Sequence, residues 1–216
     1  MKHAFAIALG VALAVSPSHS RAAAPIGGSA DTEARTLLRE LVAIRSAKGQ
    51  AQVPKVAELL AERFRRAGFA DADIRILRTN RDDGEPIAAL LLRYRAVDPN
   101  GARPIALLGH MDVVDADAAR WQSDPFVMSE RDGYWYGRGS ADNKGPIAAI
   151  ASTLIRLKRA GWAPRRDLVL ALSGDEESGS KTTMTLVRDP WLQGVEYAIN
   201  GDTGGGQRDA DGGHPV

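Results

Sequence analysis

Residues 105–112, IALLGHMD, decide the fold and contain the first candidate functional residues. Residues 105–108 are a short, wholly apolar run, which is the pattern of a strand buried on both faces. His110 and Asp112 follow this run almost directly. In an open α/β sheet, ligands bind in the loops beyond the carboxyl ends of the strands. The stretch therefore predicts a central strand with a functional site at its carboxyl end.

Two further apolar runs end in the same way. Residues 168–172 lead into a loop that contains Glu176 and Glu177, and residues 195–199 lead into Asp202. Carboxylates and imidazoles are common ligands of divalent metal ions. Because each run is followed by such groups, we expect them to meet at one edge of the sheet.

Each acidic residue also has a simpler explanation when taken alone. Asp142 could cap the helix that starts near Pro146, Asp202 could be a turn residue before glycines, and the two glutamates could lie in a solvated turn. Their recurrence after successive strands favours a shared site. In an extended segment, residues two apart point the same way, so Asp112 can accept the imidazole N–H of His110.

The rest of the hydrophobic pattern alternates between helical and strand periodicity. Helices are predicted at 31–44, with Asp31 or Thr32 as N-cap, at 53–67, from Pro146 to just before Gly161, and at 182–188. Strands are predicted at 74–79 and 87–97, joined by a hairpin turn at 82–84. This order predicts an α/β domain with a central, mostly parallel or mixed sheet flanked by helices.

The composition limits the classes of function. The 216 residues are 44% hydrophobic and 25% charged, which is typical of a folded protein. The absence of Cys excludes disulfides, thiolate nucleophiles and Cys-ligated zinc. The 28 Lys and Arg against 27 Asp and Glu leave a net charge of +1, so there is no electrostatic reason to expect a nucleic-acid partner.

Residues 1–24 have the pattern of a secretory signal peptide. A short basic start is followed by an apolar run at 4–15 and then by small residues up to Ala24. The run is shorter than the ~20 apolar residues that span a bilayer, so we expect no stable membrane anchor. The pattern predicts an exported protein, periplasmic or secreted.

Six ordered blocks together resemble the di-zinc exopeptidase family (metallopeptidase family M-twenty) of aminoacylase, carboxypeptidase G, carnosinase-like dipeptidases and succinyl-diaminopimelate desuccinylase. The blocks are GHMDVV at 109–114, Trp121 with DPF at 124–126, GYWYGRG at 133–139, DNKGP at 142–146, EESG at 176–179, and Asp202. The resemblance extends from about residue 31 to residue 206. It implies a zinc-exopeptidase-like catalytic domain, and Asn143 is most similar to the carnosinase-like branch.

The resemblance implies a site for two divalent metal ions. His110 and Asp202 would bind the first ion, Glu177 would bind the second, and Asp142 would bridge the two. Such a site with one imidazole and several carboxylates suits zinc, with cobalt or manganese as substitutes.

The resemblance also implies the chemistry. Glu176 would be the general base for metal-assisted hydrolysis of a peptide or N-acyl amide bond, and Asp112 would orient His110. The substrate would be a small peptide or an N-acyl amino acid. The family further implies a non-proline cis peptide bond after Asp142.

Other parts of the family pattern do not match this sequence. The family takes a late His as a ligand of the second ion and uses a lid domain that dimerises and binds the substrate carboxylate. His214 does not match the late His motif. We therefore expect residues 25–216 to be the N-terminal portion of the catalytic domain, truncated at its C-terminus and without the lid, and we expect full-length relatives to be dimers.

Two other classes of function stay open at this point. The chain could be an inactive metal-binding or interaction remnant of such an enzyme. Residues 202–206, DTGGG, are similar to a phosphate loop of actin-like and sugar-kinase ATPases, since backbone N–H groups of glycine-rich loops bind phosphates. A serine hydrolase is not favoured, because no Gly-x-Ser-x-Gly turn is present.

Overall fold

The computed structural model describes residues 29–98 and 102–202. The predicted signal peptide at 1–24, the glycines at 204–206 and His214 lie outside the described residues. Among the residues that the structure describes, no helix has the length and apolar character needed to cross a membrane.

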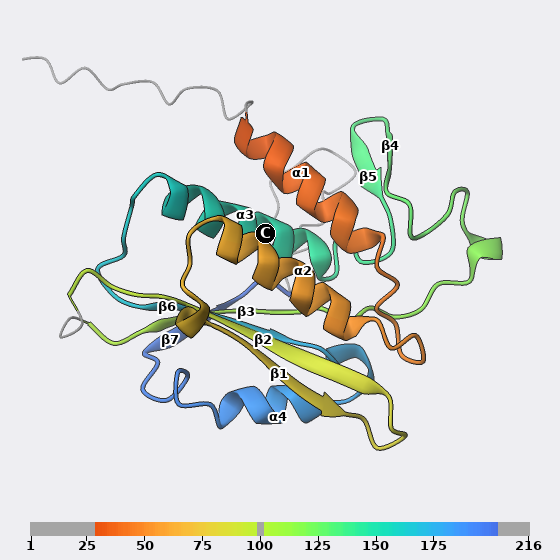
Figure 1. Ribbon diagram of the computed structural model, residues 1–216. Helices are drawn as coiled ribbons and strands as arrows, with labels where there is room; N and C mark the ends of the chain where they lie inside the picture. Colours follow the sequence, from red (N-terminus) through yellow and green to blue (C-terminus); the bar gives the residue numbers. More distant parts are fainter. Residues whose placement is uncertain (1–28, 99–101, 203–216) are drawn as a thin grey trace, which may run out of the picture.

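Within the described residues, five strands form one mixed sheet in the order β1-β2-β6-β3-β7 (Figure 1). Strand β2 pairs antiparallel with β1 and β6, whereas β3 pairs parallel with both β6 and β7. The predicted α/β fold with a mixed sheet is therefore confirmed. The strand bounds are β1 (Ile74–Asn80), β2 (Pro86–Tyr94), β3 (Ile105–His110), β6 (Leu168–Ser173) and β7 (Tyr197–Asn200).

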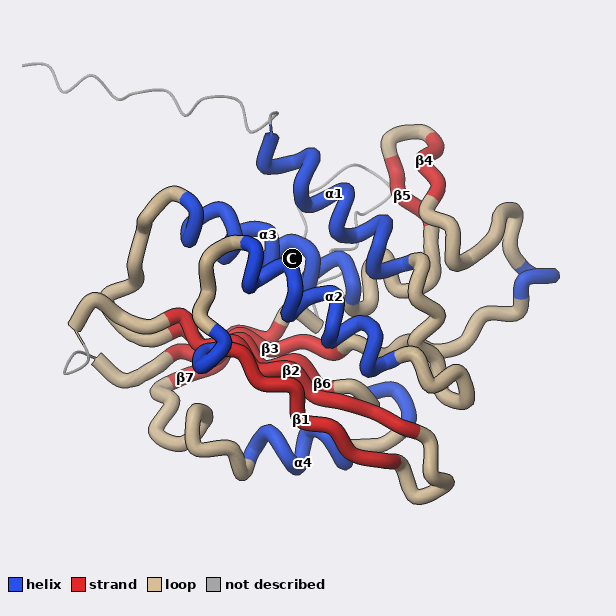
Figure 2. Tube along the Cα trace, viewed as in Figure 1, coloured by secondary structure: helices blue, strands red, loops and turns tan. Residues whose placement is uncertain are grey.

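Helices flank the sheet on both faces, as the tube in Figure 2 shows. Over the described part of the chain, α1, α2 and α3 lie on one face and α4 lies on the other (Figure 1). The two layers bury residues 87–92 of strand β2 between them, which explains the continuous apolar sequence of this stretch. The helix bounds are α1 (Ser29–Val42), α2 (Val53–Arg66), α3 (Lys144–Arg159) and α4 (Lys181–Val187).

The core follows the periodicity of the sequence. In α2, Val56, Leu60 and Phe64 recur every four residues and are all 0% exposed. In β2, Leu90 packs in the core cluster beneath α1 to α3, while its neighbour Leu91 packs on the α4 side. Alternate residues of one strand therefore belong to different cores.

Most helix and strand ends differ from the predictions by one to three residues, and two of these differences bear on specific expectations. Helix α1 begins at Ser29, so Asp31 and Thr32 lie inside it and the predicted N-cap is wrong. Strand β2 ends at Tyr94 and not at residue 97, because Tyr94 pairs with Leu168, the first residue of β6, and the ladder stops there.

One further feature of the sheets was not predicted, and one prediction about them is wrong. Strands β4 (Ser129–Arg131) and β5 (Tyr134–Tyr136) form a separate hairpin. Its turn has positive φ at Asp132 and Gly133, and an Asp-Gly pair is a known hairpin signal. The prediction that residues 105–108 form a strand buried on both faces is wrong: β3 is only partly buried, because it adjoins β7, all of whose residues are exposed.

The burial of β2 gives a test that uses two isoleucines in strands of the same sheet. Ile87 in β2 is 0% exposed and Ile199 in β7 is 54% exposed. Ile87→Ala leaves a cavity and should lower the free energy of unfolding by about 2–5 kcal/mol in urea denaturation. Ile199→Ala should change it by less than about 0.5 kcal/mol. Equal losses in the two variants would contradict the described burial.

Candidate metal centre

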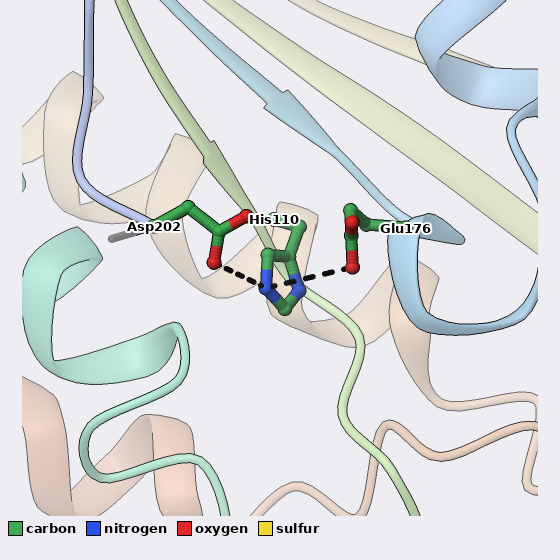
Figure 3. Close-up of side chains that lie close together, drawn as sticks. All are labelled: His110, Glu176 and Asp202. Atoms are coloured by element: carbon green, nitrogen blue, oxygen red, sulfur yellow. Dashed lines mark ion pairs between the residues drawn. The ribbon is translucent and has the colours of Figure 1, made fainter.

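The candidate residues lie at or just beyond the carboxyl ends of three parallel strands, except Asp142, which lies in the turn before α3. His110 is the last residue of β3 and pairs with Ser173 at the end of β6. Glu176 lies in a short 3-10 turn after β6, and Asp202 follows β7. Figure 3 shows the side chains of His110, Glu176 and Asp202 pointing toward one another. The parallel pairing thus brings together three loops that are distant in sequence.

Three carboxylates approach the same nitrogen of His110. From its Nε2 atom, Asp142 Oδ1 is 2.9 Å away, Asp202 Oδ1 is 3.4 Å away and Glu176 Oε2 is 4.0 Å away. The His110 side chain is 2% exposed, whereas that of Asp142 is 61% exposed. The imidazole therefore forms the floor of the site, and the carboxylates form its more exposed rim.

Asp112 contacts the Nδ1 side of the His110 imidazole and also bonds to the loop that carries the two glutamates. His110 Nδ1 is 3.1 Å from the backbone carbonyl of Asp112 and 3.4 Å from its Oδ1 atom. The Asp112 carboxylate also accepts the backbone N–H groups of Glu176 and Glu177, each at 3.0 Å. This buried carboxylate therefore connects the end of β3 to the loop that carries both glutamates.

The imidazole of His110 and the carboxylate of Glu177 have pKa values that are shifted by their neighbours in the site. Burial lowers the pKa of His110, but the hydrogen bond and charge of Asp112, together with Asp142 and Asp202, raise it to about 9. Burial raises the pKa of Glu177, and the charges of Asp142, Glu176 and Asp112 raise it further, while His110 opposes them. Crowded carboxylates of this kind favour any cation that binds among them.

The residues fit a divalent metal ion. Among the described residues, His110, Glu176 and Asp202 form one group, and His110, Asp142 and Glu177 form another; in each, the ligand atoms lie within 4.8 Å of one another. One imidazole and several carboxylates are the donors that zinc, cobalt and manganese accept. The two groups share His110, so they lie side by side in a single site.

The peptide bond between Asp142 and Asn143 is cis, so that expectation is confirmed. The alternative that Asp142 caps the next helix is wrong. The N-cap residue of α3 is Asn143, which makes no side-chain cap bond, and the Asp142 carboxylate contacts His110 instead.

Asn143 is a residue whose place in the site the sequence reasoning missed. Its side chain is buried, and its Nδ2 atom donates to Asp202 Oδ1 at 3.3 Å. Its Oδ1 atom accepts the backbone N–H of His110 at 3.4 Å. A Cβ on Gly109 would lie 2.7 Å from the same Oδ1 atom, so glycine is needed there. Its position within the DNKGP block was the available signal.

Comparison with known proteins places this geometry in a family. Residues 106–211 match the family described as Peptidase family M20/M25/M40. Over this segment the chain belongs to that family. The resemblance inferred from the six sequence blocks is therefore confirmed, and by family the chain is grouped with metallopeptidases and amidohydrolases.

Individual relatives of this M20 chain are considerably longer. Human "Beta-Ala-His dipeptidase" is 32% identical over 178 residues, which cover 76% of this chain and 35% of the relative. "N-fatty-acyl-amino acid synthase/hydrolase PM20D1" of Xenopus tropicalis is 42% identical over 102 residues, which cover 47% of this chain and 20% of the relative. The crystal structure of human carnosine dipeptidase 1 superposes with a TM-score of 0.64 at 28% identity and covers 81% of this chain and 39% of that one.

The double attachment of Asp112 gives a test by amide hydrogen exchange. Asp112→Asn replaces one acceptor oxygen by a donor and weakens a hydrogen bond to a charged group by about 1.5 kcal/mol, so exchange at Glu176 or Glu177 should become about tenfold faster. Asp117→Asn is the matched control, because Asp117 accepts the N–H of Ala119 in an exposed turn. Unchanged exchange at both glutamates in Asp112→Asn would refute this role of Asp112.

Proposed function

We propose that this chain binds two divalent metal ions, zinc by preference, and hydrolyses the peptide or N-acyl amide bond of a small substrate. The observation that carries the proposal is the convergence of Asp142, Asp202 and Glu176 on the Nε2 atom of His110. The relatives, a dipeptidase and an N-fatty-acyl-amino acid synthase/hydrolase, support a small peptide or an N-acyl amino acid as substrate.

We assign the ligands as the family resemblance implies, within the two overlapping groups of His110 and carboxylates. His110 and Asp202 would hold the first ion, Glu177 would hold the second, and Asp142 would contribute to both. In support, the side chain of Asp142 lies 2.9 Å from His110 and its charge acts on Glu177. Two bound metal ions would polarise the scissile carbonyl and lower the pKa of the attacking water.

Glu176 is the general base in this proposal. Its side chain is 47% exposed, so it can face both solvent and substrate. Its carboxylate accepts the proton of the attacking water and returns it to the leaving amine nitrogen. The backbone N–H of Glu176 donates to the carboxylate of Asp112, and this bond fixes the backbone position from which the Glu176 side chain extends. Asp112 and Asn143 position His110 and Asp202 and do not touch the substrate.

Glu176 also belongs to one of the two groups that could hold an ion, so its role as base needs a separate test. In Glu176→Gln, hydrolysis should fall by about 10²–10⁴-fold, the usual contribution of a general base. The number of zinc ions per chain, measured by elemental analysis after dialysis, should stay at about two, as in the parent chain. In Glu177→Gln it should fall by about one. Glu130→Gln, in the exposed strand β4, is the control and should change neither value.

Activity should be measured on β-alanyl-histidine, other dipeptides and N-acyl amino acids, with and without a chelator. Loss of an ion in Glu176→Gln would make Glu176 a ligand and overturn its assignment as base. Two bound ions without hydrolysis of any of these substrates would favour the inactive metal-binding remnant. A parent chain that binds no zinc would overturn the proposal itself.

A further inference from the structure

Lys144 is a fully buried lysine next to the candidate metal centre. It is the first residue of α3 and is 0% exposed. Its Nζ atom donates to the backbone carbonyl of Ile44 at 2.6 Å, across 100 positions of sequence. Burial of a lysine side chain is costly and is rare in proteins unless the polar end has a partner. This contact joins the Asp142 end of α3 to the loop after α1.

The same loop also holds the segment that carries Asp112. Ser46 is 0% exposed, and its Oγ atom donates to the backbone carbonyl of Met111 at 2.7 Å. The backbone N–H of Val113 donates to the carbonyl of Ser46 at 3.3 Å. We call residues 44–47 the bridge segment, because it bonds to Lys144 on one side and to residues on both sides of Asp112 on the other.

The packing around Lys144 leaves little room for a second arrangement. A Cβ on Gly139 would lie 3.1 Å from Lys144 Cδ and 2.7 Å from Val113 Cγ1. A Cβ on Gly145 would lie 2.2 Å from the carbonyl oxygen of Ser140. The lysine stem is thus enclosed between the bridge segment and the loop that precedes α3.

We infer that Lys144 is a positioning residue that, through the bridge segment, sets the distance between Asp142 and the His110–Asp112 pair. The inference rests on the proposed metal site and concerns what holds its ligand side chains in place before an ion binds. The contact does not depend on the charge of Lys144, because a neutral amine still donates an N–H to the Ile44 carbonyl.

A purely electrostatic role makes the opposite prediction. A cation beside an acidic site repels metal ions, so removal of the Lys144 charge alone would strengthen metal binding. Loss of positioning would weaken metal binding, because the ligand side chains would no longer be held in the arrangement that binds the ion. The sign of the change therefore separates the two roles.

The test is Lys144→Met in the full chain, which keeps the length and removes the donor. Groups that orient metal ligands typically contribute 10–100-fold to metal affinity, so zinc affinity by calorimetry should fall by about that factor. The visible absorption of the cobalt-loaded protein, which reports ligand geometry, should also change. Lys158→Met removes the same charge from the last turn of the same helix and should leave affinity and spectrum unchanged.

Ser46→Ala tests the other side of the bridge segment and decides the question if Lys144→Met does not fold. It should weaken zinc binding by about tenfold. Ser152→Ala is its control, since Ser152 is buried in α3 and bonds within the helix to Ala149. Unchanged or tighter zinc binding in Lys144→Met, whatever the cobalt spectrum, overturns this inference but not the proposed function. If Lys144→Met does not fold, unchanged binding in Ser46→Ala overturns it. A parent chain that binds no metal overturns the proposed function and this inference together.

Discussion

The parallel pairing of β3 with both β6 and β7 is the constraint on which the candidate site depends. The register sets His110 beside Ser173 and Leu108 beside Asn200, so the loops after all three strands begin at the same edge. A slip of one residue would turn every side chain of a strand to the opposite face of the sheet. His110 would then leave the site. The burial of β2 between two helical layers stabilises the sheet that maintains this register.

Repulsion among the carboxylates of the rim destabilises the folded state locally, and buried hydrogen bonds offset this cost. Asp112 accepts two backbone N–H groups of the glutamate loop, and Asn143 donates to Asp202. These bonds hold the rim carboxylates close to one another although their charges repel. The raised pKa of Glu177 is one consequence, since burial and its acidic neighbours both disfavour its charged form. A site with this balance is preformed for a cation.

Much of this arrangement could be predicted from the sequence, because it follows from local patterns. The apolar runs at 168–172 and 195–199 indicated strands, and the polar residues after them indicated the rim. The hairpin of β4 and β5 was harder, because three residues are too few for a clear alternation. The partial exposure of β3 could not be predicted, because it depends on which elements cover the neighbouring strand.

Buried polar contacts between segments distant in sequence also could not be predicted. Lys144 and Ile44 are 100 positions apart, and their contact depends on how α3 packs near the loop after α1. Asn143 was noticed as a marker of a family branch, yet its bonds to His110 and Asp202 depend on the positions of three loops. Ser46 gave no signal at all, since a single serine in a loop has no pattern.

Anomalous X-ray scattering at the zinc edge, from crystals of the chain grown with zinc, tests the central claim most directly. The account predicts two peaks beside the side chain of His110. One should lie within bonding distance of His110 and Asp202, about 2.0–2.2 Å from the ligand atoms, and the other beside Glu177, with Asp142 between them. No peak at this edge of the sheet, or zinc bound elsewhere on the chain, would contradict it.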